Sequence, residues 1–250
     1  MSEALDIKLV QDTEMLRVWL YRGESRRLVV SFSPTCAPGE EPGYDLAAVA
    51  TRDGQDNALF IADKTNSWLN APGLIEEIVQ WVEAYKIASD ATEIMTLGQS
   101  MGGFMALAMP KFMPVDSAVA FAPQFSVHPE EVPEESRWAV YRRKISQFRI
   151  RSLDDTLVDN VAYFALHDYS EDEAPQRDRF PNRDNLTHLI LPDAGENVPQ
   201  DLRRKGLLGE VVEWGFQNRP RKMRLSLAPL NVFRRHLDGE PEFPGSTQSA

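Results

Sequence analysis

One serine in this chain has glycines on both sides, at a spacing that few folds can use. The stretch "TLGQSMGG" (96–103) places Gly98 two positions before Ser100 and Gly102 two positions after it. The apolar run "EIMTLG" (93–98) precedes the serine, and "MGGFMALAM" (101–109) follows it. A strand that passes through such a serine into a helix predicts a turn too sharp for residues with a Cβ atom at the glycine positions. The feature therefore requires a strand joined directly to a helix.

Strands and helices alternate along most of the chain. The helices are predicted at 72–87, 101–109 and 198–214, and this alternation favours right-handed crossovers and a mostly parallel sheet. The later strand-like runs are almost continuously apolar, as strands covered on both faces must be. The fold class is therefore predicted as α/β, doubly wound, with about seven strands. The predicted strands are 15–21, 27–33, 58–63, 93–98, 117–123, 161–168 and 187–193. The first two are close together and indicate an antiparallel start.

The length of 250 residues fits one large domain, predicted to cover 1–214. Residues 128–160 interrupt the alternation and are too long for a simple crossover. The near-helical spacing of Trp138, Tyr141, Ile145 and Phe148 is compatible with a helix packed on the sheet or with a small helical lid. Residues 215–250 show no clear strand and are predicted to form a tail, basic at first and disordered at its end.

Charge and composition exclude several classes of function. The net charge of −11 disfavours nucleic acid or an anionic membrane as the main partner. The single cysteine, Cys36, excludes an internal disulfide and suits a reducing compartment. The start "MSEALDIKLV" has no signal-peptide pattern, and no apolar run reaches the length of a membrane span, so a cytoplasmic location is expected.

The segment 219–235 reverses the overall charge, because it contains five arginines and one lysine but no acidic residue. Two interpretations are open. The segment folds back on the acidic surface of its own chain, or it docks an acidic protein partner or a second copy of the chain as a homodimer.

The strand, the G-x-S-x-G turn and the helix together resemble the α/β-hydrolase superfamily, and the likeness covers roughly residues 15–214. By that resemblance Ser100 is the nucleophile of a catalytic triad, and the amide of Met101 is half of the oxyanion hole. The other half is expected from the loop after the strand at 27–33. Because Pro34 has no N–H, the resemblance implies the amide of Ser33 or Thr35.

In this superfamily the triad acid follows the next-but-one strand after the serine. That place is occupied here by "ALHDYSEDEAPQ" (165–176), which offers Asp168, Glu171 and Asp172. Asp172 is favoured, because a short loop normally separates the strand from the acid. Asp168 is the main alternative, and the remaining interpretation is that all three are solvated loop charges.

The triad base should follow the last strand, but no histidine occurs between 189 and 235. Glu196 occupies the expected position. A carboxylate can accept the serine proton, but its ordinary pKa of about 4.3 makes it a weaker base than histidine by about two units. His128 and His236 are the alternative bases, whereas His167 and His188 are predicted to be structural.

Two functions from different classes follow. The first is a serine esterase or deacylase that acts on a small ester, acyl sugar or thioester. The second is a non-catalytic binding or scaffold protein with a degraded triad. Trp68 either lines the substrate pocket or is a buried loop anchor. No metal-ligand cluster, phosphate-binding loop or dinucleotide motif occurs, so neither a metal nor a cofactor is expected.

Overall fold

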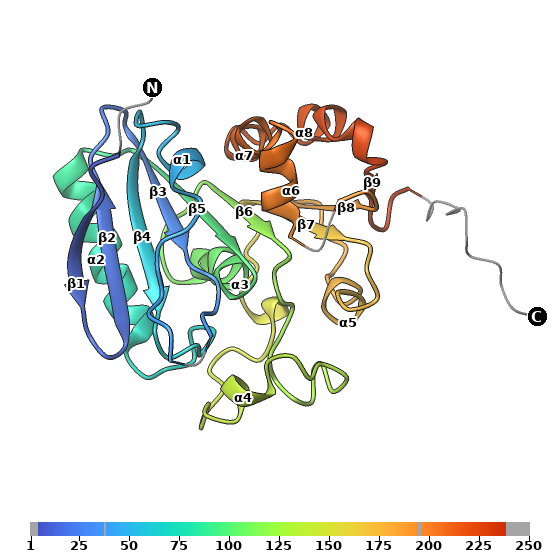
Figure 1. Cartoon of the computed structure of the whole chain (residues 1–250), viewed down its shortest axis with the longest axis horizontal. Helices are drawn as coiled ribbons and strands as arrows, with labels where there is room; N and C mark the ends of the chain where they lie inside the picture. Colours follow the sequence, from blue (N-terminus) through green and yellow to red (C-terminus); the bar gives the residue numbers. More distant parts are fainter. Residues whose placement is uncertain (1–4, 38, 195–196, 239–250) are drawn as a thin grey trace, which may run out of the picture.

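The computed structural model describes residues 5–37, 39–194 and 197–238. Within them, one nine-stranded sheet forms the centre of the molecule, in the order β1-β2-β4-β3-β5-β6-β7-β8-β9 (Figure 1). The strands are β1 (Lys8–Asp12), β2 (Leu16–Tyr21), β3 (Arg27–Phe32), β4 (Asn57–Asp63), β5 (Glu93–Gln99), β6 (Ser117–Phe121), β7 (Ala162–Asp168), β8 (Leu186–Leu191) and β9 (Phe233–Arg234).

The sheet is parallel from β4 through β3 and β5 to β8, with antiparallel strands at both edges. The predicted α/β class, with a mostly parallel sheet, is therefore confirmed. The predicted antiparallel start is confirmed in direction, because β2 runs antiparallel to β4 and therefore to β3. The two runs are not adjacent, however, because β4 lies between β2 and β3 and pairs with both. The two strands missing from the prediction, β1 and β9, are the edge strands, which are short and carry little buried apolar surface.

Helices cover both faces of this sheet. On one face lie α2 (Leu74–Ser89) and α3 (Met101–Ala108), and on the other lie α1 (Ala47–Ala50), α6 (Val198–Arg204) and α7 (Leu208–Phe216). The single helix predicted at 198–214 is divided, because Gly206 adopts φ 71° between α6 and α7. No helix in the described ranges has the length and apolar character needed to cross a membrane.

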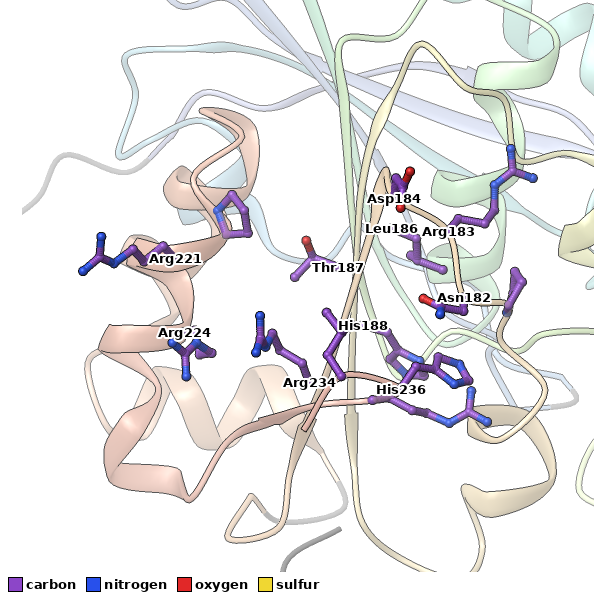
Figure 2. Close-up of a pocket in the computed structure, with 14 residues that line it drawn as sticks. Asn182, Arg183, Asp184, Leu186, Thr187, His188, Arg221, Arg224, Arg234 and His236 are labelled. Carbon is purple, nitrogen blue, oxygen red and sulfur yellow. The ribbon is translucent and has the colours of Figure 1, made fainter. Parts of the chain in front are cut away.

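The C-terminal segment is part of this fold, and the prediction of a tail without a strand is wrong for its first part. The helix α8 (Pro220–Ser226) and the turn η3 (Ala228–Leu230) lead to β9, which pairs antiparallel with β8. Figure 2 shows Arg221 and Arg224 of α8 and Arg234 of β9 around Thr187 of β8. Residues 239–250, for which disorder was predicted, lie outside the described residues.

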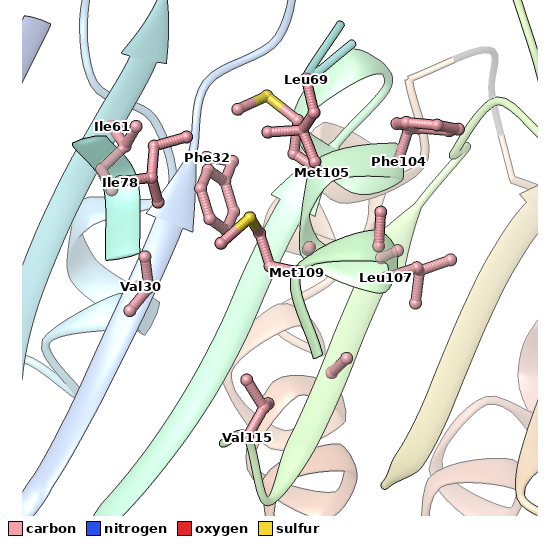
Figure 3. Packing of buried hydrophobic residues seen from close by; sticks show 14 of the residues in the cluster. Val30, Phe32, Ile61, Leu69, Ile78, Phe104, Met105, Leu107, Met109 and Val115 are labelled. Atoms are coloured by element: carbon pink, nitrogen blue, oxygen red, sulfur yellow. The ribbon is translucent and has the colours of Figure 1, made fainter. Parts of the chain in front are cut away.

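The core consists of two apolar clusters, one on each face of the sheet. In β3 the alternation is direct, since Val30 and Phe32 belong to the cluster under α2 and α3, whereas Val29 belongs to the opposite one. Figure 3 shows Val30 and Phe32 packed near Met105 and Met109. Burial on both faces explains why the central strands are almost continuously apolar.

Residues 128–160 are mostly irregular. They contain the short helix α4 (Ala139–Arg142) and the turn η2 (Leu153–Asp155), so the longer helix suggested by the spacing from Trp138 to Phe148 is wrong. Val132, Tyr141 and Leu153 are buried in the same cluster as α2 and α3. The segment therefore contributes to the core, and no lid is shown within 128–160. A further four-residue helix, α5 (Ala174–Arg177), follows β7.

Candidate functional site

Ser100 lies in the turn between β5 and α3, with φ 55° and ψ −123°. A Cβ atom added to Gly98 would lie 2.1 Å from the carbonyl oxygen of Gly102, and one added to Gly102 would lie 2.1 Å from the carbonyl oxygen of Phe32. Neither position can therefore hold a side chain. The predicted sharp strand-to-helix turn with Ser100 at its tip is confirmed.

Some of the other non-glycine residues with positive φ follow β6 and β4 of the same sheet. Ala122 has φ 42° just after β6, and Asn66, Trp68 and Leu69 have φ values of 49°, 51° and 67° after β4. Such conformations cost about 1–3 kcal/mol each in residues with a side chain, and they gather at functional sites. The carboxyl edge of a parallel sheet is also where α/β proteins bind ligands. This edge, around Ser100, is therefore the candidate site.

The Ser100 side chain is held by a hydrogen-bond relay from the loops that follow β4 and β6. The Nε1–H of Trp68 donates to Oε1 of Gln124 at 2.9 Å, and Nε2 of Gln124 donates to Ser100 Oγ at 3.1 Å. The orientation of the amide is fixed, because an indole nitrogen only donates and must face the amide oxygen. Ser100 Oγ is thus an acceptor in this bond, and its own hydrogen is free to be donated elsewhere.

Trp68 was predicted either to line the substrate pocket or to be a buried loop anchor, and it is the buried anchor. Its side chain has no exposed surface, and its ring packs on Trp138 and Tyr141 with centroid distances of 5.9 and 6.3 Å. It therefore offers no open aromatic face to a substrate, which corrects the pocket-lining interpretation. Its contribution to the site is the bond to Gln124.

In the described structure, the hydrogen bonds of the four histidines go to partners other than Ser100. His128 Nδ1 accepts from the amide of Glu130 at 3.2 Å, and His236 Nε2 lies 3.0 Å from the carbonyl oxygen of Phe180. His167 and His188 are buried and lie against each other, with Nδ1 of the first 2.9 Å from Nε2 of the second. Burial lowers the pKa of His167 to about 3 and that of His188 well below its ordinary value. These two rings are therefore neutral.

The candidate acids differ sharply in burial. Asp168 ends β7 and is 3% exposed, whereas Glu171 and Asp172 are exposed in the turn before α5. Oδ1 of Asp168 accepts from the amide of Ser170 at 2.7 Å, and its buried Oδ2 has no hydrogen-bond partner among the described residues. A buried carboxylate oxygen without a donor needs a partner. The role of Asp172 as the acid stays a prediction.

The backbone donors predicted for an oxyanion are not equally available. The amide of Met101 is at the first position of α3, where N–H groups have no partner inside the helix. The amide of Ser33 already donates to the carbonyl of Ile61 at 2.9 Å, so it is not free, which corrects that alternative. Thr35 is half-buried in the same loop and is the candidate that is left.

The loop between β8 and α6 contains Glu196, the predicted base, which lies outside the described residues together with Gly195. The next residue, Asn197, caps α6 by accepting from the amide of Gln200 at 3.1 Å. A small cavity of about 190 Å³ opens here beside Gln99, the residue before Ser100. Its walls are mainly polar and consist of Asp45, Leu46, Gln99, Asn197, Pro199, Gln200 and Arg203. Over the described ranges, no three His, Cys, Asp or Glu side chains are grouped to hold a metal ion.

Gln124 is a site residue that was not predicted from the sequence. It follows β6 by three positions, in the stretch "FAPQ" (121–124), and β6 is the direct neighbour of β5 in the sheet. A polar residue just after the strand next to the serine strand was the available signal. It could be used only once the strand order was known.

No family model matches the sequence, and no curated protein matches it either. Solved structures do match. The capsule O-acetyltransferase of Neisseria meningitidis serogroup A is 12% identical with a TM-score of 0.59, covering 80% of this chain and 93% of that one. Est1E from Butyrivibrio proteoclasticus is 14% identical with a TM-score of 0.52, covering 89% of this chain and 99% of that one.

A third similar structure is an α/β serine hydrolase without a lid from Xanthomonas campestris. It is 12% identical to this chain with a TM-score of 0.54, and the match covers 81% of this chain and 88% of that one. At these identities the likeness is one of fold. The chain has the fold of the α/β hydrolases, and its activity must be argued from the site itself.

Proposed function

We propose that this protein transfers an acyl group from a small ester, acyl sugar or thioester through Ser100, to water or to a hydroxyl acceptor. The observation that carries the proposal is the conformation of Ser100, with φ 55° at the amino end of α3. Backbone strain of this kind is kept where a side chain must be presented in one direction. The similar structures support acyl chemistry, because their names describe serine hydrolases and an O-acetyltransferase.

In the proposed reaction Ser100 Oγ attacks the carbonyl carbon of the substrate while its hydroxyl proton passes to a base. The carbonyl oxygen becomes negatively charged and accepts hydrogen bonds from the amides of Met101 and Thr35. The bond to the leaving group then breaks, and the leaving group takes the proton. Water or a hydroxyl attacks the acyl-serine in the same way, which releases the product and restores Ser100.

Gln124 has a positioning role in this scheme. Because its Nε2–H occupies one lone pair of Ser100 Oγ, the hydroxyl hydrogen is directed to another acceptor. The rotation of Gln124 is in turn restricted by the indole of Trp68. The relay therefore limits the orientations of the nucleophile without removing its proton.

For the base we propose Glu196, on its place in the sequence between β8 and α6, with His128 and His236 as the alternatives. For the acid behind it we propose Asp168 rather than Asp172, because Asp168 has the buried oxygen that lacks a donor. A carboxylate behind the base can accept a hydrogen bond from the carboxyl group that forms when the base takes the serine proton.

The cavity beside Gln99 supports a hydroxylated acceptor or substrate. Asp45, Gln200 and Arg203 in its walls offer both hydrogen-bond donors and acceptors, as a sugar or polyol needs. Its volume of about 190 Å³ suits a small group rather than a long acyl chain.

The test is covalent labelling of Ser100 by a fluorophosphonate, read by intact mass and by peptide mapping. Labelling of the parent protein should be complete, be lost in Ser100→Ala, and persist in Ser146→Ala, which removes an exposed serine of the 128–160 segment. Labelled protein should also lose hydrolysis of p-nitrophenyl acetate. A parent protein that neither labels nor hydrolyses this ester would exclude the proposed function.

A further inference from the structure

A second cavity, of about 410 Å³, lies at the other end of the sheet between β8, α8 and the residues around β9 (Figure 2). Its walls are unusually basic, with five arginines and two histidines but a single acidic residue, Asp184. The arginines are Arg183, Arg221, Arg224, Arg234 and Arg235. In a chain of net charge −11 this is a local reversal of sign.

The arginines of this cavity are only partly neutralised by carboxylates. Arg183 pairs with Asp159 at 2.6 Å, and Arg234 pairs with Asp238 at 2.7 Å. Arg235 pairs with Asp178 at 3.7 Å. Arg221 and Arg224, on α8, make no ion pair within the described part of the chain, and Figure 2 shows them on the same side of the cavity. Because His188 in the wall is held neutral by burial, the positive charge comes mainly from the arginine side chains.

We propose that this cavity binds a small molecule that carries a phosphate group. Guanidinium groups bind phosphate oxygens in pairs, and a dianion is the charge that several neighbouring arginines can share. The volume lies in the range of about 300–1,000 Å³ that small-molecule sites occupy. Leu186, Pro220 and Leu237 add apolar surface for the rest of the molecule. A concave pocket of this size favours a compact ligand over a flat macromolecular surface.

This site is separate from the one around Ser100. Strand β8 is three positions from β5 in the sheet, and neighbouring strands lie about 4.8 Å apart, so the two sites are on the order of 14 Å apart. Among the lining residues, His236 is one of the two alternative bases, and none of the others is assigned a role in acyl transfer. The inference therefore does not depend on the proposed function and can be tested by binding alone.

The test is calorimetric titration of the full chain with inorganic phosphate and with glycerol 3-phosphate, with acetate and glycerol as comparisons. Both phosphates should bind. The double variant Arg221→Gln/Arg224→Gln should weaken binding by at least about tenfold, which corresponds to about 1.4 kcal/mol. Arg219→Gln is the matched control, because Arg219 precedes α8 and is exposed but does not line the cavity. It should change the affinity by less than about twofold.

Three results would overturn the inference. The first is no binding of either phosphate by the parent protein, and the second is an equal loss in Arg219→Gln, which would indicate general charge attraction. The third is binding only to a carboxylate, to an acidic peptide such as polyglutamate, or to phosphatidylcholine vesicles that contain phosphatidic acid. Circular dichroism of each variant checks that the fold is kept.

Discussion

Gln124 Nε2 lies 3.1 Å from Ser100 Oγ and donates a hydrogen bond to it, across 24 positions of sequence. The other end of the same amide accepts from Trp68, so a fully buried indole determines which way the serine hydroxyl can turn. The catalytic serine that we propose is therefore supported from the core and not only by its own turn.

Loss of the indole N–H should cost stability through Gln124. In Trp68→Phe the buried Oε1 of Gln124 loses its donor, and an unsatisfied buried acceptor costs about 1–3 kcal/mol. Trp138→Phe is the control, because the buried Nε1 of Trp138 has no hydrogen-bond partner in the described structure. Urea unfolding should show Trp68→Phe to be less stable than Trp138→Phe by about 1–2 kcal/mol. Equal stabilities would mean that the relay contributes nothing.

The two glycines around Ser100 should not tolerate even a methyl group. In Gly98→Ala and Gly102→Ala the new Cβ would lie 2.1 Å from a backbone oxygen, which no side-chain movement can relieve. We expect a loss of stability on the order of 3 kcal/mol or more for each variant. Gly209→Ala, in α7 with open space around its Cβ position, should instead stabilise by about 0.5–1 kcal/mol. The measurement is the melting temperature of each variant, and equal melting temperatures for all three would contradict this expectation.

The predictable parts of the structure are those that depend on local constraints. The strands β2 to β8 could be predicted from their apolar, β-branched and aromatic residues, which are near-continuous in β4, β6 and β7, where both faces are buried. The Ser100 turn could be predicted because two backbone clashes require glycine. The edge strand β1 has mostly exposed residues and β9 only two residues, so neither has a strong pattern.

The site was less predictable because its contacts cross between strands that are distant in sequence. The bond from Trp68 to Gln124 spans 56 positions and depends on where β4 and β6 end in the sheet. Likewise, the choice between the amides of Ser33 and Thr35 as oxyanion donors depends on the hydrogen bond from the Ser33 amide to the next strand, which only the structure shows. Spacing within the chain contains no information on either point.

The proposed acid can be assigned with paired variants. Asp168→Asn should reduce the rate of Ser100 labelling by at least about tenfold, because the buried oxygen that we expect to hold the base becomes an amide. Asp172→Asn removes an exposed charge and should leave the rate within about twofold of the parent. The reverse order of effects would assign the role to Asp172, as the loop spacing first indicated.

The proposed base can be tested at Glu196. A histidine there would supply a base with a pKa near 6.5, so hydrolysis of p-nitrophenyl acetate should rise at least about tenfold in Glu196→His, a change of about 1.4 kcal/mol in the barrier. Glu196→Gln should lower it, since an amide cannot take the serine proton. If neither variant changes the rate, the base is elsewhere, and His128→Gln and His236→Gln become the variants to measure.

The buried pair His167–His188 has a fixed tautomer. The carbonyl of Pro123 only accepts, so His167 Nε2, 3.0 Å away, must be the donor. Because the ring is neutral, its Nδ1 then accepts, and Nε2 of His188 donates to it. Both ring nitrogens of His167 are thus engaged, whereas Nδ1 of His188 is buried without a partner among the described residues. Burial accounts for the low pKa values of both rings.

This pair should make the protein less stable in mild acid. The pKa of His167 falls from 6.5 in the unfolded chain to about 3 in the folded one, so between these pH values the unfolded state binds more protons. The contribution of the pair to the free energy of unfolding is therefore complete above pH 6.5. It decreases as the pH falls, by about 1.4 kcal/mol per pH unit for each buried ring.

In His188→Gln the amide nitrogen can still donate to His167 while one titrating ring is lost, so the slope between about pH 6.5 and 5 should be roughly halved. His128→Gln alters a half-buried loop histidine outside the pair and should keep the parent slope in urea unfolding across this range. A parent stability that does not change with pH would mean that the pair is not held neutral.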